Sequence, residues 1–233
     1  MKASTFKTFD SKESLFKCLT NDVTEILTEA IKQRDRASFA VSGGKTPQPF
    51  FQALSAAKLN WSKVSVTLAD ERWVPTDHAD SNEKLVRDSL RVEGLRLISL
   101  KSSAADPYLG SVDVSRSLAT MSKPFDVVVL GMGDDGHTAS LFPTSKDLKL
   151  ALYPENAETL CVGLTPPAYA PHPRITLTLP ALLDSKKIIV LINGDKKKSV
   201  YFKACEEGPV EEMPIRAILQ QQKTPVEVYW TAE

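Results

Sequence analysis

Residues 125–143 read FDVVVLGMGDDGHTASLFP, and this stretch determines how the rest of the chain is interpreted. Its apolar run at 127–130 predicts a buried strand that leads directly into a glycine-rich turn. The turn carries two acids, Asp134 and Asp135, and then His137, which we expect at the start of a short helix. In open α/β sheets, ligands bind beyond the carboxyl ends of the strands. His137, with an acid two residues before it, is therefore a candidate general base.

Two other interpretations of this turn stay open at this point. Gly131, Gly133 and Gly136 spell G-x-G-x-x-G after a strand, which formally matches a dinucleotide-binding fingerprint. A dinucleotide-binding helix should run for several turns, however, and Pro143 lies seven residues after the third glycine. The turn could also be purely structural, with its second acid capping a helix and the histidine exposed. Three glycines and two acids around one histidine exceed what a connecting loop requires, which favours a catalytic turn.

Composition bounds the class of protein. The 233-residue chain can bury a substantial core, and we expect one domain spanning 1–233. Lys+Arg and Asp+Glu are equal at 29 each, so the net charge is zero and does not favour binding to nucleic acid or to an anionic membrane. Cys18, Cys161 and Cys205 form no C-x-x-C pair, which indicates reduced thiols and argues against a zinc site, as does the absence of an H-E-x-x-H motif. With no signal sequence and no run of about 18 apolar residues, the chain is expected to be soluble and cytoplasmic.

The spacing of apolar runs predicts the fold. Short, nearly continuous apolar runs are typical of strands buried on both faces, and they occur at 39–41, 64–68, 127–130, 160–164, 188–192 and 226–230. Helical patterns are predicted between them, at 11–34, 47–57, 81–91, 113–121 and 196–205. This alternation predicts an α/β fold with a doubly wound, mainly parallel sheet and helices on both faces.

A candidate anion site follows the first of these strands, where the chain reads SGGKTP. Paired glycines allow backbone N–H groups to turn toward a ligand, and Pro47 suits the first position of a helix. Backbone N–H groups at a helix N-terminus attract anions, and two hydroxyls add donors. The candidate residues are Ser42, Gly43, Gly44, Lys45 and Thr46. A simple strand-to-helix turn is the alternative.

The second strand ends in the sequence DERWVP, with charged residues at the same expected edge of the sheet. At this edge, the Arg72 guanidinium would interact with a bound anion or with an oxyanion. In the alternative, this is a solvated loop in which Asp70 or Glu71 pairs with Arg72. Ser81 and Asn82 follow downstream, and a helix cap explains them about equally well.

Three more residues are candidates near the carboxyl ends of later strands. Arg174 follows a proline-rich loop, and Lys196 opens a helix after the strand at 188–192, a place suited to phosphate. Two further lysines follow Lys196, so a solvated basic face is the alternative. His172 lies between two prolines and could line a pocket rim, whereas His78, in a polar loop, is expected to be a surface residue.

These motifs resemble those of one known family. SGGKTP, LADERWVP with a downstream SN, LGMGDDGHTASLFP, PHPRITLT and INGDKKK occur in the order found in the 6-phosphogluconolactonases, across residues 42–198. The resemblance implies hydrolysis of 6-phospho-D-glucono-1,5-lactone to 6-phosphogluconate in the oxidative pentose phosphate pathway. It also implies a fold related to glucosamine-6-phosphate deaminase and ribose-5-phosphate isomerase, with neither a metal nor an organic cofactor.

The resemblance also implies roles for individual residues. The catalytic group would be His137, with Asp135 or a carbonyl holding its tautomer and Arg72 near the phosphate or the lactone carbonyl. The substrate-binding group would comprise Ser42, Gly43, Gly44, Lys45, Thr46, Asp70, Gly133, Arg174, Lys196 and His172. The expected partner is a small sugar-phosphate lactone, and the expected state is a monomer or weak homodimer.

Three other functions remain to be weighed. Deaminases resembling this chain carry D-E-Y where this chain has Asp70-Glu71-Arg72. They also carry a glutamate five residues after the histidine, where this chain has Phe142. A nucleotide-dependent oxidoreductase would use the three glycines of the turn for a pyrophosphate. A non-catalytic sugar-phosphate sensor would keep the phosphate loop without needing His137.

Overall fold

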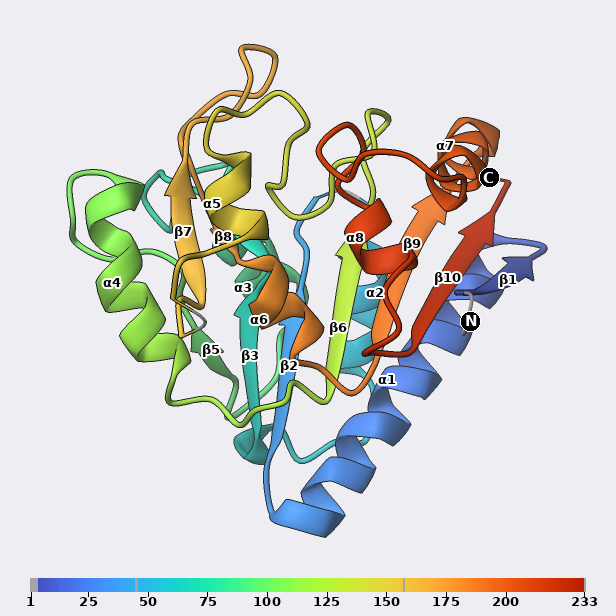
Figure 1. Ribbon diagram of the computed structural model, residues 1–233. Coiled ribbons are helices and arrows are strands. Elements are labelled where there is room, and N and C mark those ends of the chain that lie inside the picture. The colour runs from blue at the N-terminus through green and yellow to red at the C-terminus, as the bar shows by residue number, and fades with distance from the viewer. Residues whose placement is uncertain (1–3, 45, 157, 233) are drawn as a thin grey trace.

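A seven-stranded parallel sheet forms the centre of the molecule (Figure 1). The computed structural model describes residues 4–44, 46–156 and 158–232. The strands, in their spatial order, are β1 (Thr5–Phe9), β10 (Val226–Thr231), β9 (Ile188–Asn193), β6 (Val127–Gly131), β2 (Ala37–Val41), β3 (Val64–Leu68) and β5 (Arg96–Ile98). The predicted mainly parallel α/β sheet is therefore confirmed.

Helices cover both faces of this sheet, as expected of a doubly wound fold. In Figure 1, α1, α2 and α3 lie behind the sheet, and α6 and α8 lie in front of it. The helices are α1 (Lys12–Arg34), α2 (Gln48–Ser55), α3 (Asn82–Ser89), α4 (Pro107–Leu118), α5 (Leu148–Leu152), α6 (Leu179–Leu183), α7 (Asp195–Cys205) and α8 (Arg216–Leu219), with a 3₁₀ turn at Trp61–Lys63. Within the described residues, no helix is long and apolar enough to cross a membrane.

A second, three-stranded antiparallel sheet was not predicted. It consists of β4 (Asp70–Arg72), β8 (Arg174–Leu177) and β7 (Cys161–Leu164). The apolar run at 160–164 thus forms a strand, but in this small sheet and not in the main one. Its register places Arg72 directly opposite Arg174, so two of the predicted site residues meet although 102 positions separate them.

Two predicted helices differ from the observed structure. The helix expected at 113–121 begins earlier, at Pro107, because Asp106 accepts a hydrogen bond from the Leu109 N–H and caps it. The short helix expected to begin at His137 does not form. The chain instead makes a tight turn closed by a Thr138–Leu141 bridge, with the Ala139 φ at 48°. The helix on which a dinucleotide pyrophosphate would rest is therefore missing after β6.

The ammonium group of Lys123 is buried away from the ligand edge of the sheet. The Lys123 Nζ lies 3.1 Å from the centroid of the Phe125 ring, and no described residue accepts a hydrogen bond from it. Burial lowers the pKa of Lys123 to about 7, and Asp184 opposes this shift only weakly. The unfolded chain therefore binds a proton at Lys123 that the folded chain releases between pH 7 and the ordinary lysine pKa of 10.5.

We expect Lys123→Met to stabilise the protein most at and below neutral pH. Stability rises with pH wherever the unfolded state binds more protons, so wild-type unfolding free energy should increase from pH 7 toward 10. The substitution should add roughly 1–3 kcal/mol at pH 6.5 and reduce this slope, because each pKa unit corresponds to about 1.4 kcal/mol. Urea unfolding at pH 6.5 and 9.5 measures both effects. The exposed Lys58→Met serves as control, and equal behaviour of the two variants would contradict the assignment.

Candidate active site

A cavity of about 270 Å³ lies at the carboxyl ends of the central strands β2, β6 and β9. Eight of the predicted site residues line it: Ser42, Gly43, Gly44, Thr46, Asp70, Arg72, Gly133 and His137. Asn82 and Lys197 line it too. Asp135, Arg174, Lys196 and His172 do not face it directly, and Lys45 lies outside the described residues. The cavity is where an open α/β sheet binds ligands.

His137 and Asp135 form a hydrogen-bonded pair on the turn after β6. The His137 Nδ1 lies 2.6 Å from Asp135 Oδ1, and the His137 backbone N–H donates to the same oxygen at 3.0 Å. An ionised carboxylate only accepts hydrogen bonds, so Nδ1 carries the proton and Nε2 keeps its lone pair. The ring is about one-third exposed and lines the cavity. The pair therefore presents a proton acceptor to whatever occupies the cavity.

Gly133 makes room for this pair. A Cβ at Gly133 would lie 2.0 Å from His137 Nδ1 and 2.6 Å from Asp135 Oδ1, so any side chain there would displace the imidazole. The Gly133 N–H also donates to the His137 carbonyl at 2.7 Å, and Gly136 adopts a φ of 80° to close the turn. Gly133 and Gly136 thus shape the turn that holds the histidine.

The side of Asp135 away from the histidine is held by a residue that sequence reasoning did not identify. The Tyr169 hydroxyl, from the proline-rich loop, donates to Asp135 Oδ2. The centroid of the Phe142 ring lies 4.6 Å from that of His137 and 6.3 Å from that of Tyr169. The imidazole is therefore constrained by one hydrogen bond and one aromatic face.

Electrostatics keep Asp135 ionised. Burial raises the pKa of Asp135, but the hydrogen bonds from His137 and Tyr169 outweigh it and hold that pKa well below its ordinary value. Burial and the neighbouring Asp135 charge raise the pKa of Tyr169 to about 12, so its hydroxyl remains a donor. Asp135 is consequently an acceptor for the histidine throughout the neutral pH range.

The SGG loop after β2 packs against the N-terminus of α3. A Cβ at Gly43 would lie 2.0 Å from the Asn82 side-chain oxygen, so this contact requires glycine, and Gly44 adopts a φ of 103°. The Ser42 hydroxyl is buried, and no described residue hydrogen-bonds to it. The loop therefore brings backbone and an unpaired hydroxyl to the cavity wall, as an anion site requires.

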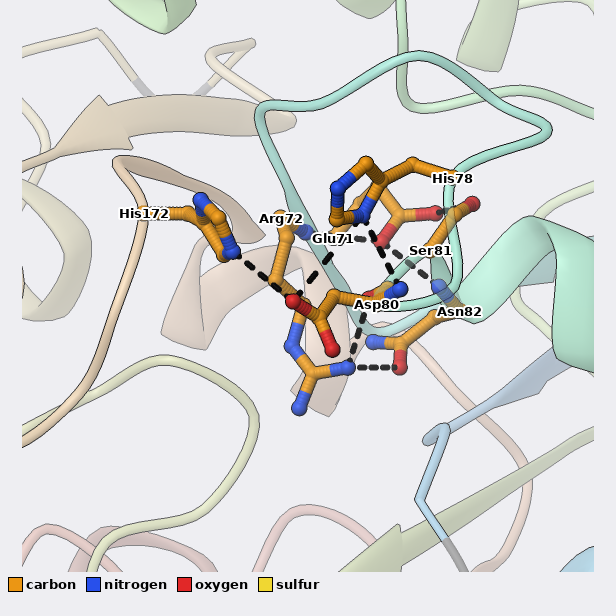
Figure 2. A network of polar contacts seen from close by, with 7 residues as sticks. All are labelled: Glu71, Arg72, His78, Asp80, Ser81, Asn82 and His172. Carbon is orange, nitrogen blue, oxygen red and sulfur yellow. Dashed lines mark hydrogen bonds and ion pairs between the residues drawn. The ribbon is translucent and has the colours of Figure 1, made fainter.

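Arg72 is held at the cavity by the segment before α3 (Figure 2). Its Nη1 donates to the Asp80 carbonyl at 2.8 Å and to Asn82 Oδ1 at 3.0 Å. Glu71 does not pair with the guanidinium; its carboxylate accepts from Ser81 Oγ and from the backbone N–H groups of residues 72, 82 and 83. Burial raises the pKa of Glu71, although these hydrogen bonds act to lower it. The alternative of an Asp70–Arg72 or Glu71–Arg72 pair is therefore wrong.

Arg174 is the buried cation behind this wall. Its side chain is 5% exposed, and no described residue accepts a hydrogen bond from its Nε or Nη1. Burial lowers its pKa, with Asp70 as the largest opposing charge. The Asp70 carboxylate is meanwhile occupied by the Ser140 hydroxyl, at 2.5 Å. A buried guanidinium with free donors is costly unless an anion approaches it.

The structure brings Lys197 to the cavity in place of Lys196. Lys197 is 25% exposed, lines the cavity, and donates to the Met132 carbonyl and to Asp134 Oδ1 at 2.9 Å. Lys196 is 75% exposed and contacts the opposite oxygen of Asp134 on the outer surface. Successive helical residues point about 100° apart, so only one of two neighbours can face the sheet edge. The geometry therefore favours Lys197 as the lysine at the site.

His172 is not among the residues that line the cavity. Its Nε2 contacts Asp80 Oδ2 at 2.9 Å, near His78 (Figure 2). Its position at a pocket rim therefore stays a prediction, and the cavity lining does not favour a direct contact between His172 and a ligand in the cavity.

Taken together, the cavity has a histidine base on one side and cationic and backbone donors on the other. Such a site can activate water next to a bound anionic substrate.

Comparison with known proteins identifies the family. The family model described as glucosamine-6-phosphate isomerases/6-phosphogluconolactonase matches residues 10–230. A 6-phosphogluconolactonase of Rhizobium meliloti is 42% identical over 226 residues, covering 95% of this chain and 96% of that protein. The crystal structure of a 6-phosphogluconolactonase from Shewanella baltica is 45% identical, with a TM-score of 0.95 and 99% of each chain covered. A monomeric glucosamine-6-phosphate deaminase, at 17% identity and a TM-score of 0.79, shares the fold. The chain belongs to the family of glucosamine-6-phosphate isomerases and 6-phosphogluconolactonases.

Proposed function

We propose that this chain hydrolyses 6-phospho-D-glucono-1,5-lactone to 6-phospho-D-gluconate, a step of the oxidative pentose phosphate pathway. The observation that carries the proposal is the His137–Asp135 pair, which presents a free Nε2 lone pair to a cavity lined by Arg72 and Lys197. The similar proteins named above are 6-phosphogluconolactonases over nearly the whole chain, which supports the same activity.

In the proposed mechanism, His137 takes a proton from a water molecule in the cavity. The hydroxide attacks the lactone carbonyl carbon, and the tetrahedral oxyanion is stabilised by Arg72 or by N–H groups of the turn. Collapse of the intermediate breaks the bond to the ring oxygen, which His137 reprotonates. General base catalysis supplies about 10²–10⁴-fold and one oxyanion donor about 10²–10³-fold. An intrinsically labile lactone needs no more than this, and neither a metal nor an organic cofactor enters the chemistry.

The substrate phosphate would bind at the opposite wall. Arg174 offers buried, unpaired donors, Lys197 offers its ammonium group, and the loop at 42–46 offers backbone N–H groups and hydroxyls. We assign the lysine role to Lys197 and not to Lys196, because Lys197 lines the cavity. Lys45 remains a proposed contact within that loop.

Deamination of an amino sugar phosphate is the rival within the family. The Phe142 ring packs against His137 at the position where deaminases resembling this chain carry a glutamate. No described carboxylate other than Asp135 hydrogen-bonds the His137 ring, so the histidine lacks a second acidic partner for ring opening. We further propose that 1–233 is one catalytic domain acting in the cytoplasm as a monomer or weak homodimer, a compartment consistent with three free cysteines.

The purified protein should accelerate the loss of freshly prepared 6-phosphogluconolactone with excess EDTA present. It should release no ammonia from glucosamine 6-phosphate, and unphosphorylated gluconolactone should be a much poorer substrate, because the phosphate contacts orient the attack. Proton release at constant pH measures lactone hydrolysis, and an ammonia assay measures deamination. Enzymatic ammonia release, or lactonase activity lost in EDTA and restored by a divalent ion, would overturn the proposal. Turnover also excludes a sensor, and thermal-shift titration with NAD(P) tests the oxidoreductase alternative.

His137→Asn should lower kcat by about 10²–10⁴-fold with little change in KM, because the substituted amide cannot accept the proton from water. Steady-state kinetics give both constants. The control is an unchanged thermal midpoint and circular dichroism spectrum. If turnover stayed near the wild-type rate, the base would have to be a group other than His137.

Lys197→Ala and Lys196→Ala form a matched pair of variants. Losing one charge-assisted hydrogen bond costs about 1.5–3 kcal/mol, so Lys197→Ala should raise KM by roughly 10–150-fold with a small effect on kcat. Lys196→Ala should change KM by less than about threefold, because exposed ion pairs contribute little. Arg174→Ala should resemble Lys197→Ala. Equal KM values for the two lysine variants would contradict the assignment.

A further inference from the structure

Two loops at the mouth of the cavity bring two histidines and an aspartate together (Figure 2). His172 Nε2 lies 2.9 Å and His78 Nδ1 3.9 Å from the same oxygen, Asp80 Oδ2. One ligand atom from each residue lies within 4.8 Å of the other two. Among the described residues, no other group of three or more histidine, cysteine, aspartate or glutamate side chains converges in this way. Such spacing is close to that of ligands around one ion.

The backbone pre-positions these side chains. His172 adopts a φ of 69°, which is uncommon for a residue other than glycine, and the residues on both sides of it are prolines. The Trp73 N–H donates to the Pro173 carbonyl at 2.8 Å, which ties this loop to the loop of His78 and Asp80. The Asp80 N–H donates to His78 Nδ1 at 3.1 Å. The cluster is therefore built from two restrained loops and not from freely moving side chains.

The chemistry of the set favours a transition-metal ion. Two neutral imidazoles and one carboxylate provide nitrogen and oxygen donors with one negative charge, the type of set that binds Zn²⁺ with an open position for water. The side chains are 43% (His78), 53% (Asp80) and 30% (His172) exposed, so an ion can enter and water can complete its coordination. Because these side chains are exposed, they can make the small movements needed to bring all three donor atoms to one ion.

We propose that His78, Asp80 and His172 form a binding site for a zinc-like divalent ion at the rim of the cavity. The three residues do not line the cavity, so the ion is separate from the chemistry proposed for His137. Its effect would be to join the two loops. One carries Tyr169, which contacts Asp135, and the other carries the Asp80 carbonyl, which accepts from Arg72. Occupancy of the site would hold both sides of the mouth in place.

Calorimetric titration of the chelator-treated, dialysed protein with ZnCl₂ tests this site. We expect one ion per chain and a rise in thermal midpoint on binding. His78→Ala and Asp80→Asn should each weaken zinc binding by at least tenfold, since losing even an outer-sphere partner of a metal ligand costs about 10–100-fold. Both side chains are exposed, so both variants should fold, and circular dichroism without metal verifies this. Co²⁺ in place of Zn²⁺ should give visible bands that both variants lose.

Two matched controls separate this site from other places that attract zinc. His137→Asn alters the histidine in the cavity, and Cys205→Ser removes the exposed thiol. Both should bind zinc as the wild type does. The proposal is overturned if wild-type protein binds no more zinc than Asp80→Asn, or if zinc binding survives in His78→Ala and Asp80→Asn but is lost in either control. The readout is binding, so the result is independent of the lactonase proposal.

Discussion

The hydrogen bond between His137 and Asp135 is the constraint on which the site depends. It sets the tautomer of the imidazole and thereby leaves a lone pair for the cavity. Its geometry exists only because Gly133 has no side chain, since a Cβ there would lie 2.0 Å from the ring nitrogen. Of the glycines that resemble a nucleotide fingerprint, Gly133 is therefore explained by the space that the His137–Asp135 pair requires, and Gly136 by its φ of 80°. Tyr169 restricts the pair further by donating to the other oxygen of Asp135, and the Phe142 ring does so by packing against His137.

The small antiparallel sheet is the second element that makes the cavity. Pairing of β4 with β8 places Arg72 opposite Arg174, one at the cavity wall and the other buried behind it. Two adjacent guanidinium groups repel each other, and the free donors of Arg174 add a desolvation cost. The phosphate binding proposed above would lower both costs, because an anion would offset the repulsion and accept hydrogen bonds from the free donors. The segment between β4 and α3 carries His78 and Asp80, and the loop between β7 and β8 carries His172.

Sequence patterns predicted the central sheet well because its strands are continuous apolar runs, which need only local reading. They missed β1, β4, β5 and β8. Of these, β4 and β5 have three residues each, and β4 consists only of charged residues. The run at 160–164 was predicted as a strand, but not as part of the small sheet. Helix α4 was predicted late because the signal for its start is the cap at Asp106, not an apolar stripe. The helix expected after His137 failed because the side chain–backbone contacts of the turn compete with helix formation.

The sequence alone determined the strand, the turn and the acid–histidine pair, because Asp135 and His137 are two residues apart and their contact is local. It also determined the order of motifs by which the family is identified. Only the tertiary structure decided that Lys197 and not Lys196 faces the cavity, since the rotation of α7 is set by packing on the sheet. It alone brought Tyr169 to Asp135 and His172 to Asp80, across 34 and 92 residues. The physical reason is that contacts between distant segments depend on how strands and loops pack, which no local spacing encodes.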